Sequence, residues 1–345
     1  MLDLRYKKQE MTTYLNDLKH YPISLNEIIR ARSIVSAFLK PTQLIRYEGL
    51  SRLLSAEVFI KHENHNPTGS FKIRGGINLM HHLRPCNISG VITFSTGNHG
   101  LSVATSAKWA GLEAVVVVPE QNNPSKNRKI LETGAELIEA GKTFEEASTT
   151  VEQLCKERGL YYVHPADEPH LINGVGTEFL EILEDLPDID LMIVPLGAGS
   201  EAAAAITVLK TIRPQTEVIA VQALNSPAAY RSWKAKSMST AENTTFAGGF
   251  ATGKAYETTF NIYCDGLSDF QLLSENEIYE SIGMAYYYTQ NLVEGAGGAT
   301  LMAALKLKDR IKGKKVVLQM SGCNAAPEEI EKAMLYSAFK KGVMI

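Results

Sequence analysis

The stretch Gly90-Val91-Ile92-Thr93-Phe94 is short, apolar and rich in β-branched residues, and Ser95-Thr96-Gly97-Asn98-His99-Gly100 follows it directly. Residues 101–109 continue with a helix-like pattern. A run of this kind predicts a buried strand, and the glycines predict a turn into the next element. The sequence therefore predicts a strand, a loop and a helix in succession, which is the repeating unit of a parallel sheet.

The same order recurs along the chain. Ala114-Val115-Val116-Val117-Val118 ends at Pro119, and Leu191-Met192-Ile193-Val194-Pro195 leads into a loop at residues 197–200. Strands that alternate with helices indicate the α/β class, with mostly parallel sheets covered by helices. Each loop would then lie at the carboxyl end of a strand, where open α/β sheets bind ligands.

Composition excludes several classes of protein. The 345 residues are 45% apolar and 21% charged, as expected of a globular chain long enough for two domains. With a formal net charge of -3 we expect no nucleic-acid partner. No run approaches the roughly 20 apolar residues of a membrane helix, the N-terminus lacks a signal-peptide core, and the four cysteines are dispersed. We expect a cytoplasmic protein with reduced thiols and no membrane association.

One lysine stands in a setting that suggests chemistry. Lys72 follows a Pro/Gly turn and Ser70, a candidate helix N-cap, and has the apolar neighbours Phe71 and Ile73. A positive helix end and apolar surroundings both disfavour an ammonium ion. Such an amine is a candidate for Schiff-base chemistry with a carbonyl cofactor, and the competing interpretation is a solvated surface lysine.

Three further loops have groups that suit anions or polar atoms. Residues 95–100 precede a helix whose first N–H groups suit a carboxylate. Residues 197–201 open an alanine-rich helix, and their glycines would let a phosphate approach the backbone. Ser321 offers a hydroxyl after the apolar run at residues 315–318. Taken alone, residues 95–100 are explained equally well as an ordinary turn, residues 197–201 are a weak signal, and the Ser321 segment is better explained as a turn.

In this order, the lysine, the carboxylate loop, the phosphate loop and the serine turn resemble the fold type II pyridoxal-phosphate enzymes, in the branch of serine/threonine dehydratases and serine racemases. The resemblance runs from about Ser24 to near the C-terminus and includes residues 61–64, 164–166, 173–177 and 294–297. It implies two open, mostly parallel twisted sheets covered by helices, with pyridoxal 5'-phosphate in a cleft between a larger and a smaller domain.

The resemblance also implies the organisation of the chain. Residues 24–77 and 168–345 would form a discontinuous large cofactor-binding domain, residues 78–167 the small domain and residues 1–23 an N-terminal arm. The family suggests that the protein forms a homodimer. It also suggests that the ligand of each subunit, besides the cofactor, is a small amino acid substrate.

By similarity, each loop acquires a role. Lys72 would hold the cofactor as a Schiff base and then act as the base at the substrate α-carbon. Asn98 would bind the phenolic oxygen of the ring, Phe71 would pack against the ring, and Ser321 would face the pyridine nitrogen. The cofactor phosphate would bind to Gly197, Ala198, Gly199 and Ser200. The substrate carboxylate would bind to Ser95, Thr96, Gly97, Asn98 and His99.

The chain departs from the family pattern at both anion loops. Ala198 and Ser200 stand where relatives have glycine, and because other residues resist positive φ, we expect a slightly different loop shape. Thr96 stands where racemases of this branch carry a serine base. Its hydroxyl would still transfer a proton, so Thr96 is the second candidate catalytic residue, although its β-methyl group restricts the side chain.

Other departures lie outside the loops. Gln222 and Ala228 replace the acidic residues of a divalent-cation site, so we expect no metal. Cys323 replaces a glycine beside Ser321, and Tyr230 with Trp233 suggests an altered substrate pocket.

The resemblance implies a dehydratase, or ammonia-lyase, that converts a β-hydroxy amino acid such as L-threonine or L-serine to a 2-oxo acid and ammonia by α,β-elimination. The hydroxyl of Ser321 would stabilise a protonated ring nitrogen less than a carboxylate does, which favours elimination over transamination. Two alternatives stay open: an amino acid racemase or a β-replacement, threonine-synthase-like enzyme of the same fold, and a binding protein that has lost catalysis.

Overall fold

The computed structural model describes residues 15–86, 88–141 and 144–336. Internal contacts divide the chain into two units. Unit 1 comprises Met1–Leu39 and Lys72–Thr177, and unit 2 comprises Lys40–Phe71 and Glu178–Ile345. The chain therefore passes from unit 2 into unit 1 between Phe71 and Lys72.

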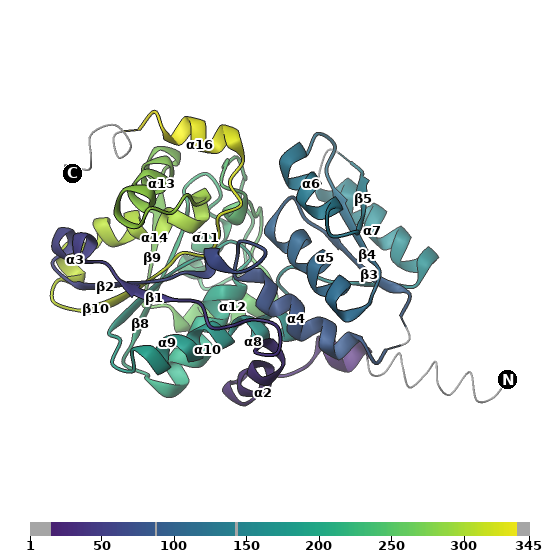
Figure 1. Ribbon diagram of the computed structural model, residues 1–345, viewed down its shortest axis with the longest axis horizontal. Coiled ribbons are helices and arrows are strands. Elements are labelled where there is room, and N and C mark those ends of the chain that lie inside the picture. The colour runs from purple at the N-terminus through teal and green to yellow at the C-terminus, as the bar shows by residue number, and fades with distance from the viewer. Residues whose placement is uncertain (1–14, 87, 142–143, 337–345) are drawn as a thin grey trace. The chain divides into compact units, whose positions relative to one another are not determined.

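Unit 2 is built on a six-stranded sheet (Figure 1). Its strands are β1 (Leu44–Arg46), β2 (Glu57–Lys61), β7 (Leu191–Pro195), β8 (Glu217–Ala223), β9 (Asp269–Leu273) and β10 (Lys315–Gln319). Their order across the sheet is β1-β2-β10-β7-β8-β9. Only the edge strand β1 runs antiparallel to its neighbour.

Helices cover both faces of this sheet. They are α3 (Glu48–Leu54), α9 (Thr177–Asp185), α10 (Ser200–Ile212), α11 (Ala228–Ala235), α12 (Glu257–Gly266), α13 (Glu275–Thr289), α14 (Gly295–Lys306), α15 (Lys308–Ile311) and α16 (Pro327–Ala333), with short 3-10 turns η1 (Glu63–His65) and η2 (Gly248–Phe250). The strand β7 is buried along its whole length, as expected for a parallel strand covered on both faces.

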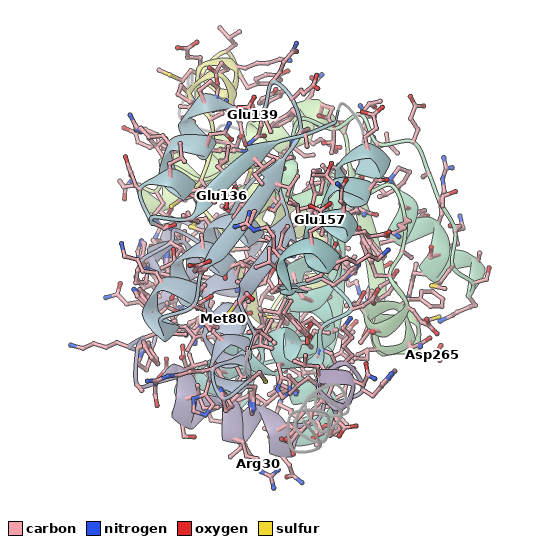
Figure 2. All side chains as sticks on the ribbon, turned by 90° about the vertical axis from the view of Figure 1, so that its right-hand side faces the viewer. Arg30, Met80, Glu136, Glu139, Glu157 and Asp265 are labelled. Carbon is pink, nitrogen blue, oxygen red and sulfur yellow. The ribbon has the colours of Figure 1, made fainter. Side chains whose placement is uncertain are left out.

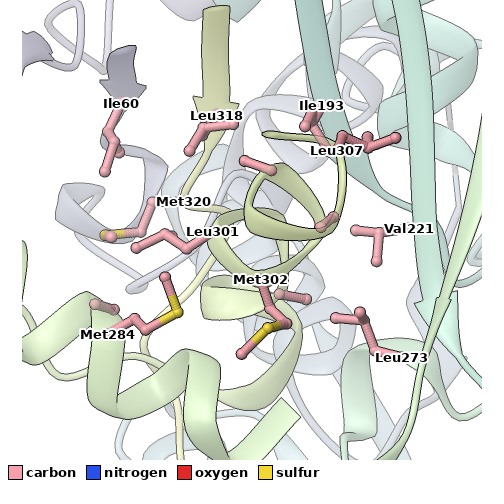
Figure 3. Close-up of a cluster of buried hydrophobic side chains, with 14 of the residues drawn as sticks. Ile60, Ile193, Val221, Leu273, Met284, Leu301, Met302, Leu307, Leu318 and Met320 are labelled. Carbon is pink, nitrogen blue, oxygen red and sulfur yellow. The ribbon is translucent and has the colours of Figure 1, made fainter. Parts of the chain in front are cut away.

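The main core of unit 2 lies between the sheet and α13 and α14 (Figure 3). Ile193, Val221 and Leu318 project from three strands toward Leu301 and Met302 of α14. The helix α14 packs this closely because its first turns consist of glycine and alanine: a Cβ added at Gly298 would lie 2.9 Å from the Ser281 carbonyl oxygen of α13. This packing sets the position of the segment that leads into α14.

Unit 1 is built on a four-stranded, wholly parallel sheet of order β5-β4-β3-β6, formed by β3 (Gly90–Phe94), β4 (Ala114–Val118), β5 (Glu136–Glu139) and β6 (Leu160–Tyr162). Its helices are α2 (Leu25–Val35), α4 (Lys72–Leu83), α5 (Asn98–Ala110), α6 (Pro124–Leu131), α7 (Phe144–Arg158) and α8 (Pro169–Val175). The edge strand β5 has exposed Glu136 and Glu139 (Figure 2), and charges of this kind discourage pairing with another chain.

The predicted α/β class with two mostly parallel sheets is confirmed. The strands expected at residues 90–94, 114–118 and 191–195 are β3, β4 and β7 with the same bounds. The contacts assign residues 24–39, 72–77 and 168–177 to unit 1, whereas the sequence-based boundaries place them in the large domain, and those boundaries stay a prediction.

The N-terminal segment is described from residue 15. Residues 15–19 are helical, Leu18 is buried in the core of unit 1, and residues 1–14 lie outside the described part of the chain. None of the four cysteines, all of which lie in the described ranges, forms a disulfide. Within the described ranges, no helix has both the length and the apolar character needed to cross a membrane.

Candidate active site

The lysine motif forms a turn that is fastened to the segment after β10. Ser70 makes an antiparallel bridge to Gly322, and the Phe71 N–H donates to the Ser321 carbonyl oxygen at 3.1 Å. The Cys323 N–H donates to the Gly69 carbonyl oxygen at 2.9 Å. The turn and the predicted serine segment are therefore one hydrogen-bonded structure in unit 2, and Lys72 follows it directly in the chain.

Two details of this turn differ from expectation. The hydroxyl of Ser70 is fully buried and has no hydrogen-bond partner, so Ser70 is not the N-cap of α4, which begins at Lys72. Cys323, for which the sequence offered no explanation, donates its thiol to the Asn64 carbonyl oxygen at 3.3 Å. This bond links the serine segment to the stretch that precedes the turn.

Lys72 is half-buried at the start of α4 in unit 1. Its carbonyl oxygen accepts a hydrogen bond from the Ser102 hydroxyl of α5 at 2.7 Å. The two helices approach closely because Gly76 faces the same surface: a Cβ there would lie 2.6 Å from the Ser102 hydroxyl. The lysine and the carboxylate loop are thus held together within unit 1.

The carboxylate loop connects β3 to α5. Ser95 accepts a hydrogen bond from the Gly97 N–H at 3.2 Å, which forms a tight turn. Gly97 is the N-cap residue and provides no side chain to cap the helix. Residues 95–98 are half-buried and so keep access to solvent. The start of α5 can therefore receive an anion.

His99 is uncharged at neutral pH. Burial, reinforced by the nearby charge of Lys72, lowers the pKa of His99 to about 3. Its Nε2 lies 3.3 Å from the Val163 carbonyl oxygen, which makes this nitrogen the donor. His99 therefore orients the loop through a neutral ring and adds no positive charge to it.

The predicted phosphate loop lies between β7 and α10 in unit 2. A Cβ at Gly197 would lie 2.0 Å from the Gly249 carbonyl oxygen, so no larger residue fits there. Gly199 has a φ of 92° and is the N-cap of α10, with no side-chain cap. Backbone N–H groups at the start of a 13-residue helix thus face a loop without bulky side chains.

The two residues of this loop that replace glycines of the family pattern stand at positions where glycine is not required. Ala198 and Ser200 are not among the residues with positive φ, and Gly199 alone has it in this loop. The expected obstacle to the loop conformation is therefore absent. Glu201, which the sequence places next in the helix, is buried with 3% of its surface exposed.

Two threonines that lie outside this loop donate hydrogen bonds to its backbone, and the sequence alone did not identify them. The Thr259 hydroxyl of α12 donates to the Ala198 carbonyl oxygen at 2.8 Å, and the Thr252 hydroxyl donates to the Gly197 carbonyl oxygen at 3.4 Å. Neither threonine belongs to a recognisable pattern. Thr259 is 61 positions from Ala198 and Thr252 is 55 positions from Gly197, so no local signal identifies either threonine.

Gln222, at the expected place of a cation ligand, has a structural role. Its Oε1 accepts a hydrogen bond from the Tyr230 N–H in the first turn of α11 at 3.1 Å. The rings of Tyr230 and Trp233 pack against Phe270 of β9, with centroids 5.6 and 5.9 Å away. In the part of the chain that the structure describes, no three His, Cys, Asp or Glu side chains form a group able to hold a metal ion. The role of Tyr230 and Trp233 in a substrate pocket stays a prediction.

The candidate residues thus form two groups. Lys72, Ser95, Thr96, Gly97, Asn98 and His99 belong to unit 1, and Phe71, Gly197, Ala198, Gly199, Ser200 and Ser321 belong to unit 2. The peptide bond between Phe71 and Lys72 joins the two groups.

Comparison with known proteins gives the same family over most of the chain. Residues 35–322 match a family model described as pyridoxal-phosphate dependent enzyme. The chain is 33% identical over 322 residues to an L-threonine ammonia-lyase from Thermotoga maritima, which covers 93% of this chain and 80% of that protein. It is 35% identical over 308 residues to a catabolic L-threonine dehydratase from Staphylococcus aureus, covering 88% and 89%. Among solved structures, maize serine racemase matches with a TM-score of 0.86 at 26% identity, over 91% of this chain and 98% of that one.

Proposed function

Because this chain belongs to the pyridoxal-phosphate-dependent enzyme family, we propose that it is a dehydratase that converts a β-hydroxy amino acid, such as L-threonine or L-serine, to a 2-oxo acid and ammonia. The threonine ammonia-lyase and dehydratase names of relatives 33–36% identical to it support this activity. The fold contributes loops at the carboxyl ends of parallel strands, where α/β enzymes bind their ligands.

The residues present fit the phosphate of the cofactor. The loop at residues 197–200 carries no side chain larger than serine, and the Cβ that would fill it at Gly197 is excluded. Gly199 leaves the start of α10 without a side-chain cap, so backbone N–H groups suit three phosphate oxygens. Gly197, Ala198, Gly199 and Ser200 would hold the phosphate.

The residues also fit the cofactor ring. Ser321 is 3% exposed and uncharged, which suits an unprotonated pyridine nitrogen. Phe71, 8% exposed, would pack against the ring, and Asn98 would donate to the phenolic oxygen. When bound, pyridoxal phosphate supplies an electron sink for the charge that develops at the substrate α-carbon.

Residues of unit 1 would bind and deprotonate the substrate. The uncapped start of α5, with the hydroxyls of Ser95 and Thr96, suits the α-carboxylate. Neutral His99 fixes this loop through Val163. Nζ of Lys72, which also attaches the cofactor, would take the proton from the α-carbon. Loss of the β-hydroxyl as water and hydrolysis of the remaining enamine then give the 2-oxo acid and ammonia.

The observation that carries the proposal is the bonding of the lysine turn to the Ser321 segment. The Phe71–Ser321 hydrogen bond and the Ser70–Gly322 bridge pair the backbone just before Lys72 with the segment that carries Ser321, whose side chain is a hydroxyl and not a carboxylate. A neutral partner for the ring nitrogen favours elimination over transamination. This supports a lyase within a family of diverse reactions.

The test is the visible absorption spectrum of the purified protein, recorded before and after excess L-threonine or L-serine, with 2-oxo acid assayed in the same samples. We expect a band of lysine-bound cofactor that shifts with substrate and yields 2-oxo acid. Lys72→Ala should remove both. A wild-type protein without this band, even after added pyridoxal phosphate, would contradict the assignment and favour a binding protein.

Racemisation is the second candidate, supported by the likeness to maize serine racemase. Thr96 is half-buried in the carboxylate loop and carries a hydroxyl able to transfer a proton. If the cofactor band shifts with L-serine but no 2-oxo acid forms, chiral chromatography of the amino acid will separate a racemase from a β-replacement enzyme. We further propose a cytoplasmic homodimer, to be tested by fractionation and by light scattering.

A further inference from the structure

The turn that leads to Lys72 makes a second set of hydrogen bonds, which involve Asn66 and Glu63. The Asn66 carbonyl oxygen accepts a hydrogen bond from the Gly69 N–H at 2.7 Å, which closes the turn. The Asn66 amide donates to Glu63 twice, to Oε2 at 2.6 Å and to the carbonyl oxygen at 3.0 Å. Asn66 therefore fixes the start of the turn, and Glu63 fixes Asn66.

Glu63 is itself held by a more distant residue. Its side chain is fully buried, and Oε1 accepts a hydrogen bond from the Thr42 hydroxyl at 2.5 Å. The Thr42 backbone is anchored on both of its polar groups: the carbonyl oxygen accepts from Lys61 Nζ at 2.8 Å, and the N–H donates to Glu181 Oε2 at 3.3 Å.

A buried ion pair lies at the end of this chain of contacts. Lys61 Nζ is 2.6 Å from Glu181 Oε2, and the side chains are 0% and 9% exposed. Because moving two charges out of water costs free energy that their attraction barely offsets, a buried ion pair by itself adds little to the stability of the fold. Its hydrogen bonds are directional and strong in a low dielectric, so they restrict the atoms that they join.

We infer that Glu181, Lys61, Thr42, Glu63 and Asn66 form a relay of positioning residues that sets the backbone of Phe71 and hence the place of Lys72. Each member contacts the next, and all belong to unit 2. The relay deepens the proposed function, since it rests on Lys72 as the residue that attaches the cofactor.

Thr42→Val tests the relay at its central link. Valine has nearly the volume of threonine, so the change removes the hydroxyl bond to Glu63 and leaves the Thr42 backbone contacts in place. Thr216→Val is the matched control, because Thr216 is also buried in unit 2 and donates its hydroxyl to the Ile189 carbonyl oxygen at 3.0 Å, outside the relay.

We expect both variants to lower the thermal midpoint, but only Thr42→Val to affect the lysine. A displacement of about 1 Å at a reacting group costs on the order of 100-fold in rate, so a partial loosening should lower kcat about tenfold with KM little changed. Hydrogen exchange of residues 66–71 in the full-length holoenzyme should accelerate in Thr42→Val and stay at the wild-type rate in Thr216→Val.

A second pair of variants separates geometry from charge. Glu63→Gln can accept from Asn66 and donate to the Thr42 hydroxyl, so it should retain most of the wild-type kcat and exchange rate. Glu63→Ala breaks both links and should reproduce the Thr42→Val result. If Thr42→Val and Thr216→Val give the same kcat and the same exchange at residues 66–71, the relay is only structural and the inference is wrong.

The readouts distinguish this inference from the proposed function. The fraction of Lys72 that carries cofactor is measured by borohydride trapping and mass spectrometry, without substrate. If the wild-type protein traps cofactor but forms no 2-oxo acid, the dehydratase assignment fails while trapping and hydrogen exchange still test the relay. Unchanged trapping and exchange in Thr42→Val would overturn the relay alone.

Discussion

At the scale of single residues, the two glycines of the phosphate loop are needed for different reasons. Gly197 is required by space, because the Gly249 carbonyl oxygen occupies the place of a side chain. Gly199 is required by its φ of 92°, which other residues adopt at a cost. Ala198 and Ser200 meet neither constraint, which explains why the loop tolerates them.

Gly197→Ala should therefore be damaging, and Ala198→Gly should not. The added methyl group would force the loop away from Gly249 and cost about 1–3 kcal/mol in the free energy of unfolding, as overpacking does. Cofactor binding should weaken as the loop moves. Denaturant unfolding and fluorescence titration with pyridoxal phosphate measure both effects, and equal behaviour of the two variants would contradict this account.

At the scale of elements, the phosphate loop depends on a helix that follows it by some sixty residues. The Thr259 hydroxyl of α12 donates to the Ala198 carbonyl oxygen, and a Cβ at Gly199 would lie 2.9 Å from the Thr259 side chain. The helix α12 packs beside α10, so the loop that precedes α10 lies against it. The loop conformation is thus a property of two elements and not of its own sequence.

Thr259→Val should weaken cofactor binding without removing it. Loss of one buried hydrogen bond costs about 1 kcal/mol, which corresponds to a roughly fivefold higher Kd if the whole cost falls on the loop. Thr207→Val is the control, because Thr207 donates only to the Ala203 carbonyl oxygen within α10. An equal rise of Kd in both variants would show that α10, not the loop, carries the effect.

At the scale of the whole molecule, both units contain buried histidines that stay neutral. Burial is the main cause that lowers the pKa of His62 to about 4 and of His99 and His170 to about 3. Because these values lie below the unfolded value near 6.5, the unfolded chain binds protons that the folded chain does not. The stability that depends on the neutral rings is present above pH 6.5 and is lost as the pH falls.

His170→Phe isolates one of these contributions. The ring of His170 is stacked between Tyr21 and His82, at centroid distances of 4.3 and 3.9 Å, and its nitrogens have no hydrogen-bond partner. Phenylalanine keeps the stacking and does not titrate. The difference in free energy of unfolding between the variant and wild type should therefore be about 2 kcal/mol more favourable to the variant at pH 5 than at pH 8.

Thermal midpoints at the two pH values measure this difference. A pH-independent difference between His170→Phe and wild type would mean that His170 is not the group that titrates on unfolding.

The sequence by itself determined the α/β class, the strands at residues 90–94, 114–118 and 191–195, and the family to which the chain belongs. These follow from local information: apolar runs of strand length, glycines at turns and motifs in a fixed order. Ser70 shows the limit of such reasoning, because its position before a helix predicts a cap, while the Ser321 segment pairs with its backbone and leaves its hydroxyl without a partner.

Only the tertiary structure decided which residues hold the candidate site in place. Thr259 reaches Ala198 across 61 positions, and Glu181 reaches Lys61 across 120. A hydrogen bond between distant positions leaves no periodicity or spacing in the sequence, because it depends on how helices and strands pack and not on the residues beside each partner. The chemistry of the loops is therefore local, whereas their geometry belongs to the packed units.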